Sequence, residues 1–391
     1  MGWKGSLIEL PVWAAGRLNP ARVDPTRTEP REILVLRPND FGDLLTTTPL
    51  FQALRLRFPS TRLIAGVGRW GRPVLENNPF VDEVVEIDAP WNNKVVRDQS
   101  LGAVARFIWK SDQVAALRAR DGFDVGIDVL GSHIGLALML RAGVRYRVGV
   151  RGYRGGWSGC QSYINFATDV HVSRAALAQA ELLGATVLPE PRPQLYLTEA
   201  ERRQAEQLWR NGAAAESKPL RLLVGSAAGI PEKSWSAQAL GAALRQIALT
   251  LERADEKIDI VIVGSPADEA KAAQIVAASG LTAGIRSLAG QTSLRITFAL
   301  AEVADIVLTN PSMLLHVAAA FRRPTVAVLG GTFPDAQAHD TVWGYPPPYR
   351  SVGPTTIMPG GPAANWPTVE QVVHAVLLTA GERVKSRSAV G

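Results

Sequence analysis

The loop 37–43 is the first of several segments that bring reactive side chains next to loop-forming residues. It follows the apolar run 33–36, ends in Gly42-Asp43, and precedes a stretch in which apolar residues recur at helical spacing. Asp43 would therefore lie in the first turn of a helix, where the helix dipole favours a negative charge. The ionised carboxylate is predicted to accept a proton from a substrate; the alternative is a carboxylate that only caps the helix.

Small and charged residues follow two further strands predicted in the second half of the chain. In residues 225–229, Ala228 and Gly229 would let backbone N–H groups approach a phosphate, and Lys233 adds a positive charge nearby. This segment matches neither a Walker nor a Rossmann fingerprint, and an exposed turn is the alternative. Asp268, just past another strand, could accept hydrogen bonds from ribose hydroxyls or cap the next helix.

A last segment, 310–316, combines a helix start with a histidine. Asn310 is predicted as the N-cap, and Pro311 suits the first helical position. The N–H groups of Ser312 and Met313 would then be free to bind a phosphate. His316 follows one turn later, where it could reach the same anion or simply pack within an apolar helix.

Alternating strands and helices are predicted to position these segments. Apolar runs predict strands at 32–37, 62–67, 83–87, 124–129, 220–225, 258–263, 305–309 and 324–329. Helical patterns lie at 112–120, 134–142, 172–184, 236–251, 267–279, 293–303, 312–321 and 368–381. The alternation predicts an α/β fold with parallel sheets and helices on both faces.

The chain is predicted to hold two domains, because it has 391 residues and its second half repeats the plan of the first. We expect an N-terminal arm and linker at 1–31, a first domain at 32–187 and a second at 188–391. The proline-containing stretch 185–197 reads as the connection between them, and residues 144–168 as irregular structure.

Composition limits the classes of partner and of site. The formal net charge of +6 favours an anionic partner, such as a phosphate-bearing substrate or an acidic glycolipid surface. Nucleic acid is not expected, because no binding module is recognisable. A single cysteine, Cys160, excludes an internal disulfide and a cysteine-based metal cluster.

The N-terminal stretch 1–18 is apolar enough to need an interpretation. Glu9 and Pro11 interrupt it, which argues against a signal peptide, and no run in the chain is long enough for a membrane-spanning helix. The stretch could pack on its own domain, or five of its apolar side chains could rest on a membrane surface: Trp3, Leu7, Ile8, Leu10 and Trp13.

Taken together, these segments resemble the glycosyltransferase family 9 heptosyltransferases from about residue 32 to residue 380. The resemblance is carried by ILVLRPNDFGDLLTTTPLFQALRLRFP, ENNPFVDEVVEID, KSW, IVIVGSPADE and LAGQTSLRITFALAEVADIVLTNPSMLLHVAAAFRRPTVAVLGGT. The family has the GT-B fold, in which two Rossmann-like domains face a central cleft. Its members transfer a heptose from an ADP-sugar to the lipopolysaccharide core, with inversion and without a bound metal or other cofactor.

The resemblance implies a metal-independent glycosyltransferase of the cytoplasm, with peripheral contact at the cytoplasmic face of the inner membrane. Residues 32–187 would form the acceptor domain and 188–391 the nucleotide-sugar donor domain. Asp43 matches the family's catalytic base, and the matching donor-binding positions are Ala228, Gly229, Lys233, Asp268, Thr292, Ser312, Met313 and His316. Four arginines could face an anionic acceptor or be solvated surface charges: Arg69, Arg72, Arg145 and Arg147.

The donor motif departs from the family pattern. The family's Asp-[Ser/Thr]-Gly-x-x-His reads Pro311-Ser312-Met313-Leu314-Leu315-His316 in this chain. A carboxylate is lost, and a bulky side chain replaces a glycine that lets backbone approach a ligand. The departure motivates an alternative, a non-catalytic or altered-donor family member that acts as a binding or scaffold protein. A nucleotide-sugar epimerase of the same shape has no motif to support it.

Overall fold

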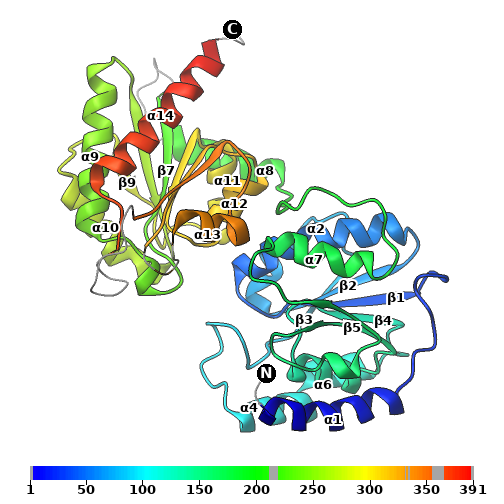
Figure 1. Ribbon diagram of the computed structural model, residues 1–391. Coiled ribbons are helices and arrows are strands. Elements are labelled where there is room, and N and C mark those ends of the chain that lie inside the picture. The colour runs from blue at the N-terminus through cyan, green and yellow to red at the C-terminus, as the bar shows by residue number, and fades with distance from the viewer. Residues whose placement is uncertain (1–2, 211–218, 331, 333–334, 355–364, 389–391) are drawn as a thin grey trace. The chain divides into compact units, whose positions relative to one another are not determined.

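The chain consists of two compact units, Met1–Tyr196 and Leu197–Gly391. The computed structural model describes residues 3–210, 219–330, 332, 335–354 and 365–388 (Figure 1). The division falls within the predicted connection 185–197, but after the expected boundary at 187/188. Residues 185–198 form no helix or strand, in agreement with their prolines.

The first unit is a parallel sheet of six strands in the order β3-β2-β1-β4-β5-β6. The strands are β1 (Glu32–Leu36), β2 (Arg62–Val67), β3 (Glu83–Glu86), β4 (Val125–Asp128), β5 (Tyr146–Arg151) and β6 (Ser162–Asn165). The helices are α1 (Trp3–Leu18), α2 (Phe41–Arg57), η1 (Arg69–Gly71), α3 (Arg72–Leu75), α4 (Leu101–Lys110), α5 (Asp112–Arg118), α6 (His133–Arg141), η2 (Trp157–Gly159) and α7 (Val172–Glu181). Helices α2 and α7 cover one face of the sheet, and α1, α4 and α6 lie on the other (Figure 1).

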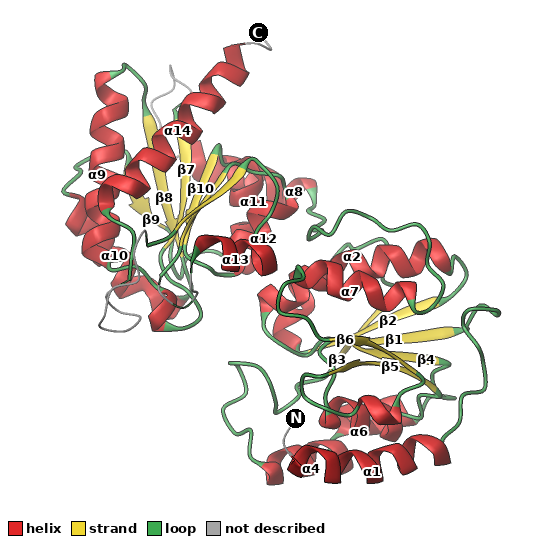
Figure 2. Ribbon diagram, in the orientation of Figure 1, coloured by secondary structure: helices red, strands yellow, loops and turns green. Residues whose placement is uncertain are grey.

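The second unit repeats this architecture with the strand order β12-β11-β10-β7-β8-β9, again all parallel. The strands are β7 (Leu220–Gly225), β8 (Ile258–Val263), β9 (Ile285–Ser287), β10 (Ile306–Thr309), β11 (Thr325–Val328) and β12 (Tyr349–Val352). The helices are α8 (Glu199–Arg210), η3 (Pro231–Lys233), α9 (Ala237–Arg253), η4 (Pro266–Asp268), α10 (Glu269–Ser279), α11 (Leu294–Val303), α12 (Met313–Ala320), α13 (Ala336–Trp343) and α14 (Val369–Ser388). Helices α9, α10 and α14 cover one face, and α8, α11, α12 and α13 the other (Figure 2).

Both sheets have the Rossmann strand order, so the predicted α/β class is confirmed. In such sheets ligands bind at the carboxyl ends of the strands, at the point where the strand order reverses. That point lies between β1 and β4 in the first unit and between β7 and β10 in the second. The Asp43 loop follows β1, and the segments that begin at Ser226 and Asn310 follow β7 and β10.

The prediction of irregular structure at 144–168 is wrong, because this region forms β5 and β6 at the edge of the first sheet. An arginine in β5 interrupts the apolar run by which a buried strand is recognised. Arg147 lies inside β5 and is 0% exposed, whereas an arginine in an alternating run normally marks a solvent face. Its guanidinium nitrogens donate to five backbone carbonyls, those of Gly16, Asn19, Val144, Arg145 and Gly159.

Helix α1 packs on its own domain, as one of the two interpretations of the N-terminal stretch predicted. The carboxylate of Glu9 accepts a hydrogen bond from the Gly156 N–H at 2.8 Å and one from the Ser158 hydroxyl. At the other end of α1, Arg147 Nη2 donates to the Gly16 carbonyl at 3.0 Å. The side chains of residues 3–8 lie outside the described part. None of the described helices is both long enough and apolar enough to span a bilayer.

A buried ion pair joins α8 to α11 and gives the second unit a pH-dependent contribution to stability. Glu201 Oε1 accepts from Arg295 Nε at 2.5 Å, and this bond is the main reason that the pKa of Glu201 is lowered to about 2. The folded pKa lies below the ordinary value of 4.5, so the stabilisation is complete above that pH and is lost as the pH falls toward 2.

We therefore expect Glu201→Gln to lower the free energy of unfolding by roughly 1–3 kcal/mol at pH 7, because one partner of a charged hydrogen bond is lost. The difference from the unaltered protein should shrink between pH 4.5 and 2, measured by urea unfolding at each pH. Glu199→Gln is the matched control, since its exposed carboxylate lies 3.9 Å from Arg203. Equal effects of the two substitutions at every pH would contradict the role of the Glu201 pair.

Candidate active site

Asp43 lies in the first turn of α2, at the carboxyl edge of the first sheet. Its side chain is 29% exposed, and Oδ1 accepts a hydrogen bond from Arg37 Nη2 at 3.2 Å. The other carboxylate oxygen, Oδ2, has no hydrogen-bond partner among the described residues. The N-cap position belongs to Asp40, and Asp43 accepts no bond from a helix N–H. The capping alternative is therefore not what the structure shows, and one oxygen is left for a ligand proton.

Arg69 and Arg72 lie at the same sheet edge as Asp43, directly after β2. The Trp70 indole N–H donates to the Asn39 carbonyl at 2.8 Å, which ties η1 to the loop that carries Asp43. Both arginine side chains are more than half exposed, at 69% and 61%. Each pairs with a carboxylate, Arg69 with Asp88 and Arg72 with Glu86, and such exposed pairs contribute little stability.

The other two arginines are not placed to bind an acceptor beside Asp43. Arg145 precedes β5, and its N–H donates to the Phe123 carbonyl at 3.0 Å, so it lies at the amino edge of the sheet, opposite Asp43. Arg147 is fully buried, and backbone carbonyls occupy its guanidinium. The predicted acceptor role of these two residues is therefore wrong. Arg145 is directed away from Asp43 by its place before β5, and Arg147 is kept from any acceptor by its burial.

Hydrogen bonds tie together the loops that follow β7 and β10 in the second unit. The Trp235 N–H donates to Asn310 Oδ1 at 2.9 Å, and the Ala228 N–H donates to Ser234 Oγ at 2.8 Å. The predicted contact between the Ala228 N–H and a phosphate is therefore replaced by a bond within the loop. Gly229 and Lys233 lie in the same loop, Lys233 at the end of η3 and half-buried.

The N-cap of α12 (Met313–Ala320) lies two residues after the predicted one. Helix α12 begins at Met313, and its N-cap is Ser312, whose Oγ accepts from the Leu314 N–H at 3.3 Å. Asn310 is not the cap, because its side-chain oxygen already accepts from Trp235, and Pro311 precedes the helix. The N–H groups of Ser312 and Met313 have no acceptor among the described residues, and anion binding by them stays a prediction.

His316 is 7% exposed and contacts the aromatic residues that end α13 and follow it. Its Nδ1 lies 2.7 Å from Tyr345 Oη, and its ring lies 6.0 Å from that of Trp343. On the Nδ1 side of its ring, His316 therefore packs among aromatic side chains, as the second interpretation of the sequence predicted.

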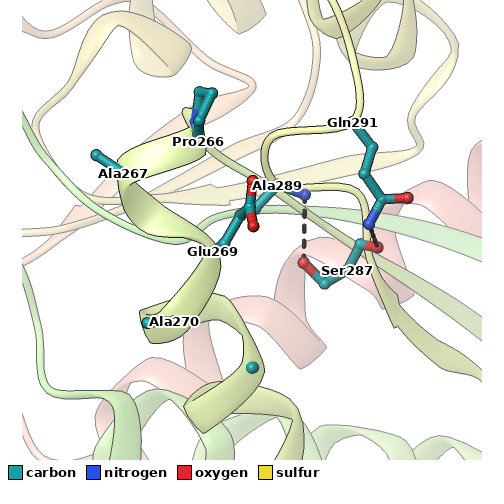
Figure 3. Close-up of a pocket in the computed structure, with 8 residues that line it drawn as sticks. Pro266, Ala267, Glu269, Ala270, Ser287, Ala289 and Gln291 are labelled. Atoms are coloured by element: carbon teal, nitrogen blue, oxygen red, sulfur yellow. Dashed lines mark hydrogen bonds between the residues drawn. The ribbon is translucent and has the colours of Figure 1, made fainter.

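Asp268 and Thr292 follow β8 and β9 at the same edge. Asp268 Oδ2 accepts from the Ser265 N–H at 2.8 Å and from its hydroxyl at 2.7 Å, as the capping alternative predicted. Thr292 Oγ1 lies 3.0 Å from Thr297 Oγ1. Beside them is an open groove of about 680 Å³ (Figure 3), which is in the size range of small-molecule sites. Its lining includes Pro266, Glu269, Ser287 and Gln291, and neither Asp268 nor Thr292 belongs to it.

Three polar residues that the sequence analysis did not single out lie at these carboxyl edges. Arg37 holds Asp43, and Thr309 Oγ1 lies 3.1 Å from the capping Ser312 Oγ. Ser226 Oγ, at the end of β7, is buried and has no hydrogen-bond partner in the described part of the chain. The only signal that the sequence offers for them is their position, Thr309 at the end of a strand and Arg37 and Ser226 directly after one.

The family of the chain follows from a comparison with known proteins. The sequence model of Glycosyltransferase family 9 (heptosyltransferase) matches residues 114–342, more than half of the chain. The chain belongs to this family. Family 9 membership makes it a glycosyltransferase, and the two Rossmann-like sheets agree with the GT-B fold of its structural neighbours.

Individual relatives of this family 9 protein have low sequence identity, but the match extends over most of both chains. Lipopolysaccharide heptosyltransferase 2 of Salmonella typhimurium is 26% identical over 322 residues, which cover 78% of this chain and 84% of that protein. Lipooligosaccharide heptosyltransferase 2 of Haemophilus influenzae is 26% identical over 319 residues, 77% of this chain and 84% of that protein.

Solved structures show the same fold at lower identity. A family 9 glycosyl transferase from Veillonella parvula has a TM-score of 0.70 at 18% identity and covers 93% of this chain and 100% of its own. The Escherichia coli ADP-heptose lps heptosyltransferase II has a TM-score of 0.68 at 21% identity, covering 91% and 99%.

Proposed function

We propose that this glycosyltransferase moves a heptose from ADP-heptose to an acceptor hydroxyl of the lipopolysaccharide core, with inversion at the anomeric carbon. The observation that carries the proposal is the Asp43 carboxylate at the switch point of the first sheet, where Arg37 holds one oxygen and no described residue bonds the other. The heptosyltransferase 2 relatives support the choice of sugar and acceptor.

In the proposed reaction the hydroxyl oxygen of the acceptor attacks the anomeric carbon, and Asp43 Oδ2 takes the proton of that hydroxyl. The bond from that carbon to the diphosphate breaks, and ADP leaves with the electron pair. The Lys233 ammonium and the N–H groups of Ser312 and Met313 would stabilise the charge that grows on the diphosphate. The charge of Lys233 and the N–H dipoles would take the place of a metal ion, so we expect the rate to be unchanged in EDTA.

The donor motif favours a second candidate function. The chain would then bind a sugar nucleotide without transferring its sugar, or would use a donor other than ADP-heptose. Met313 occupies the first turn of α12 with a half-buried side chain, at the place of the family's glycine. A bulky residue there limits how closely the helix start can approach a phosphate.

A donor screen separates these candidates. The purified protein is mixed with ADP-, GDP-, UDP- and dTDP-sugars, and the release of each nucleotide is measured with and without a heptose-bearing core acceptor. We expect acceptor-dependent release of ADP from ADP-heptose. Release from another sugar nucleotide alone would show an altered donor, and binding of ADP without any release would show a scaffold.

We also propose that the enzyme works at the cytoplasmic face of the inner membrane and touches it through α1 and α4. These helices lie on the same face of the first sheet (Figure 1). Large apolar side chains project from both, with Leu10 69%, Trp13 47%, Leu101 85% and Trp109 65% exposed. Exposed tryptophans beside cations suit the headgroup layer of an anionic membrane.

Cations accompany both tryptophans, since the Arg17 guanidinium lies 5.4 Å from the Trp13 ring centre and that of Arg141 4.9 Å from Trp109. We expect the double variant Trp13→Ala/Trp109→Ala to co-sediment several-fold less with vesicles that contain anionic lipid. The control is Leu378→Ala, which removes an exposed apolar side chain from α14. Equal loss in both variants, or no binding by the unaltered protein, would contradict a membrane contact at α1 and α4.

A further inference from the structure

Arg37 is a buried cation whose contacts converge on one residue, Asp43. It directly follows β1, its N–H donates to the Gly66 carbonyl at 2.8 Å, and its side chain is 9% exposed. Nη2 donates to the Asp43 carboxylate oxygen Oδ1 at 3.2 Å, and Nε donates to the Asp43 backbone carbonyl at 3.3 Å. The planar guanidinium therefore holds the side chain and the backbone of the same residue.

We infer that Arg37 is a positioning residue that fixes the Asp43 carboxylate and selects Oδ2 as the oxygen that takes the acceptor proton. This inference rests on the proposed role of Asp43 as the base. With Oδ1 on Arg37, the carboxylate cannot rotate about its Cβ–Cγ bond without breaking a charge-assisted hydrogen bond. Oδ2 then points in one direction, so the carboxylate samples fewer unproductive orientations before it meets the acceptor hydroxyl.

Positioning, and not activation, is the effect expected from this contact. The hydrogen bond to Oδ1 fixes the direction in which Oδ2 points, and the guanidinium itself takes no proton from the acceptor. Arg37 therefore benefits turnover through geometry. A lysine at this place would keep the charge but could not bridge the carboxylate and the carbonyl with a rigid fork.

A second carboxylate, Asp128, interacts electrostatically with Arg37 at the same edge of the sheet. It ends β4, where it pairs in register with Leu36, the residue before Arg37, and it attracts the guanidinium electrostatically. Burial raises the pKa of Asp128, while hydrogen bonds from the N–H groups of Gly131 and Ser132 oppose this rise. The Ser132 N–H donates to Oδ2 at 2.9 Å, so this carboxylate is itself fixed. Arg37 thus interacts with one buried carboxylate, Asp128, and hydrogen-bonds to one that reaches solvent, Asp43.

The test uses the full-length protein with Arg37→Gln, Arg37→Lys and a matched control. Arg55→Gln is that control, because Arg55 also bridges a carboxylate, Asp82, and a carbonyl, that of Thr61 at 2.7 Å, at the other end of α2. Thermal melts and ADP titration first establish that each variant is folded and binds nucleotide. Steady-state kinetics with ADP-heptose and a core acceptor then give kcat and KM.

We expect Arg37→Gln to lower kcat about 10- to 100-fold with the donor KM nearly unchanged, because only the orientation of the base is lost. Arg37→Lys should recover part of kcat, and Arg55→Gln should turn over like the unaltered enzyme. A normal kcat in Arg37→Gln, or equal losses in Arg37→Gln and Arg55→Gln, would overturn the inference. If Arg37→Gln does not fold, Arg37→Lys decides, since a kcat equal to that of the unaltered enzyme excludes a need for the fork.

Asp43→Asn separates this inference from the proposed function. If Asp43→Asn still transfers the sugar, the assignment of the base fails and the role of Arg37 fails with it. If Asp43→Asn is inactive while Arg37→Gln has a normal kcat, the base stands and only the positioning role is lost.

Discussion

Replacing Asp43 with asparagine should lower kcat for heptosyl transfer by about 10²- to 10⁴-fold while nucleotide binding is retained. Asparagine has nearly the same shape, and its amide oxygen can still accept the hydrogen bond from Arg37 Nη2. What it lacks is the basicity to take a proton from the acceptor hydroxyl. Single-turnover kinetics with ADP-heptose measure the loss, and calorimetric titration with ADP measures the binding.

Asp40→Asn is the matched control for this prediction. Asp40 is a carboxylate in the same loop, but its Oδ1 accepts from the Lys94 N–H at 2.9 Å and its other oxygen lies 3.4 Å from Lys94 Nζ. Both of its oxygens are therefore engaged, and the substitution should leave kcat within a few-fold of normal. Similar losses at Asp40 and Asp43 would point to a general effect of loop charge instead of a specific base.

Replacing Arg147 with methionine should destabilise the protein by roughly 3–5 kcal/mol, the largest effect on stability that we expect from a single residue. Methionine fills much of the volume, but the carbonyls of Gly16, Asn19, Val144 and Gly159 lose their donor inside the fold. Urea unfolding measures the change, and hydrogen exchange should show helix α1 opening first, because two of the lost bonds hold its end.

Arg145→Met supplies the comparison for Arg147→Met. Its side chain makes no hydrogen bond within the described part of the chain and is only half-buried, so the free energy of unfolding should change by less than about 0.5 kcal/mol. A loss below about 1 kcal/mol in Arg147→Met, or unchanged exchange in α1, would show that water replaces the guanidinium at little cost.

Much of the fold could be predicted because buried parallel strands are continuous apolar runs. The runs that became β1, β2, β7 and β8 are of this kind, and the helix-forming stretches between them gave the Rossmann plan. Strand β5 escaped prediction because the guanidinium of Arg147 is satisfied by carbonyls that only the folded chain brings to it. Local pattern carries no information about such distant partners.

The candidate site was predictable only where one residue and its local backbone decide the geometry. Gly42-Asp43 after an apolar run predicts a carboxylate at a helix start, and the structure has it there. The choice of cap at α12 was not predictable, since Asn310 and Ser312 are both good N-caps and a distant N–H, that of Trp235, decides between them. The pairing of Arg37 with Asp43 likewise depends on how the loop folds back.

The mass of the acceptor after reaction tests the central claim most directly. A heptose-bearing core acceptor is incubated with ADP-heptose and either the unaltered protein or Asp43→Asn, and the product is analysed by mass spectrometry. We predict that the acceptor gains one heptosyl residue with the unaltered protein and none with Asp43→Asn. An acceptor of unchanged mass with the unaltered protein, or an equal gain with both, would contradict transfer by a base at Asp43.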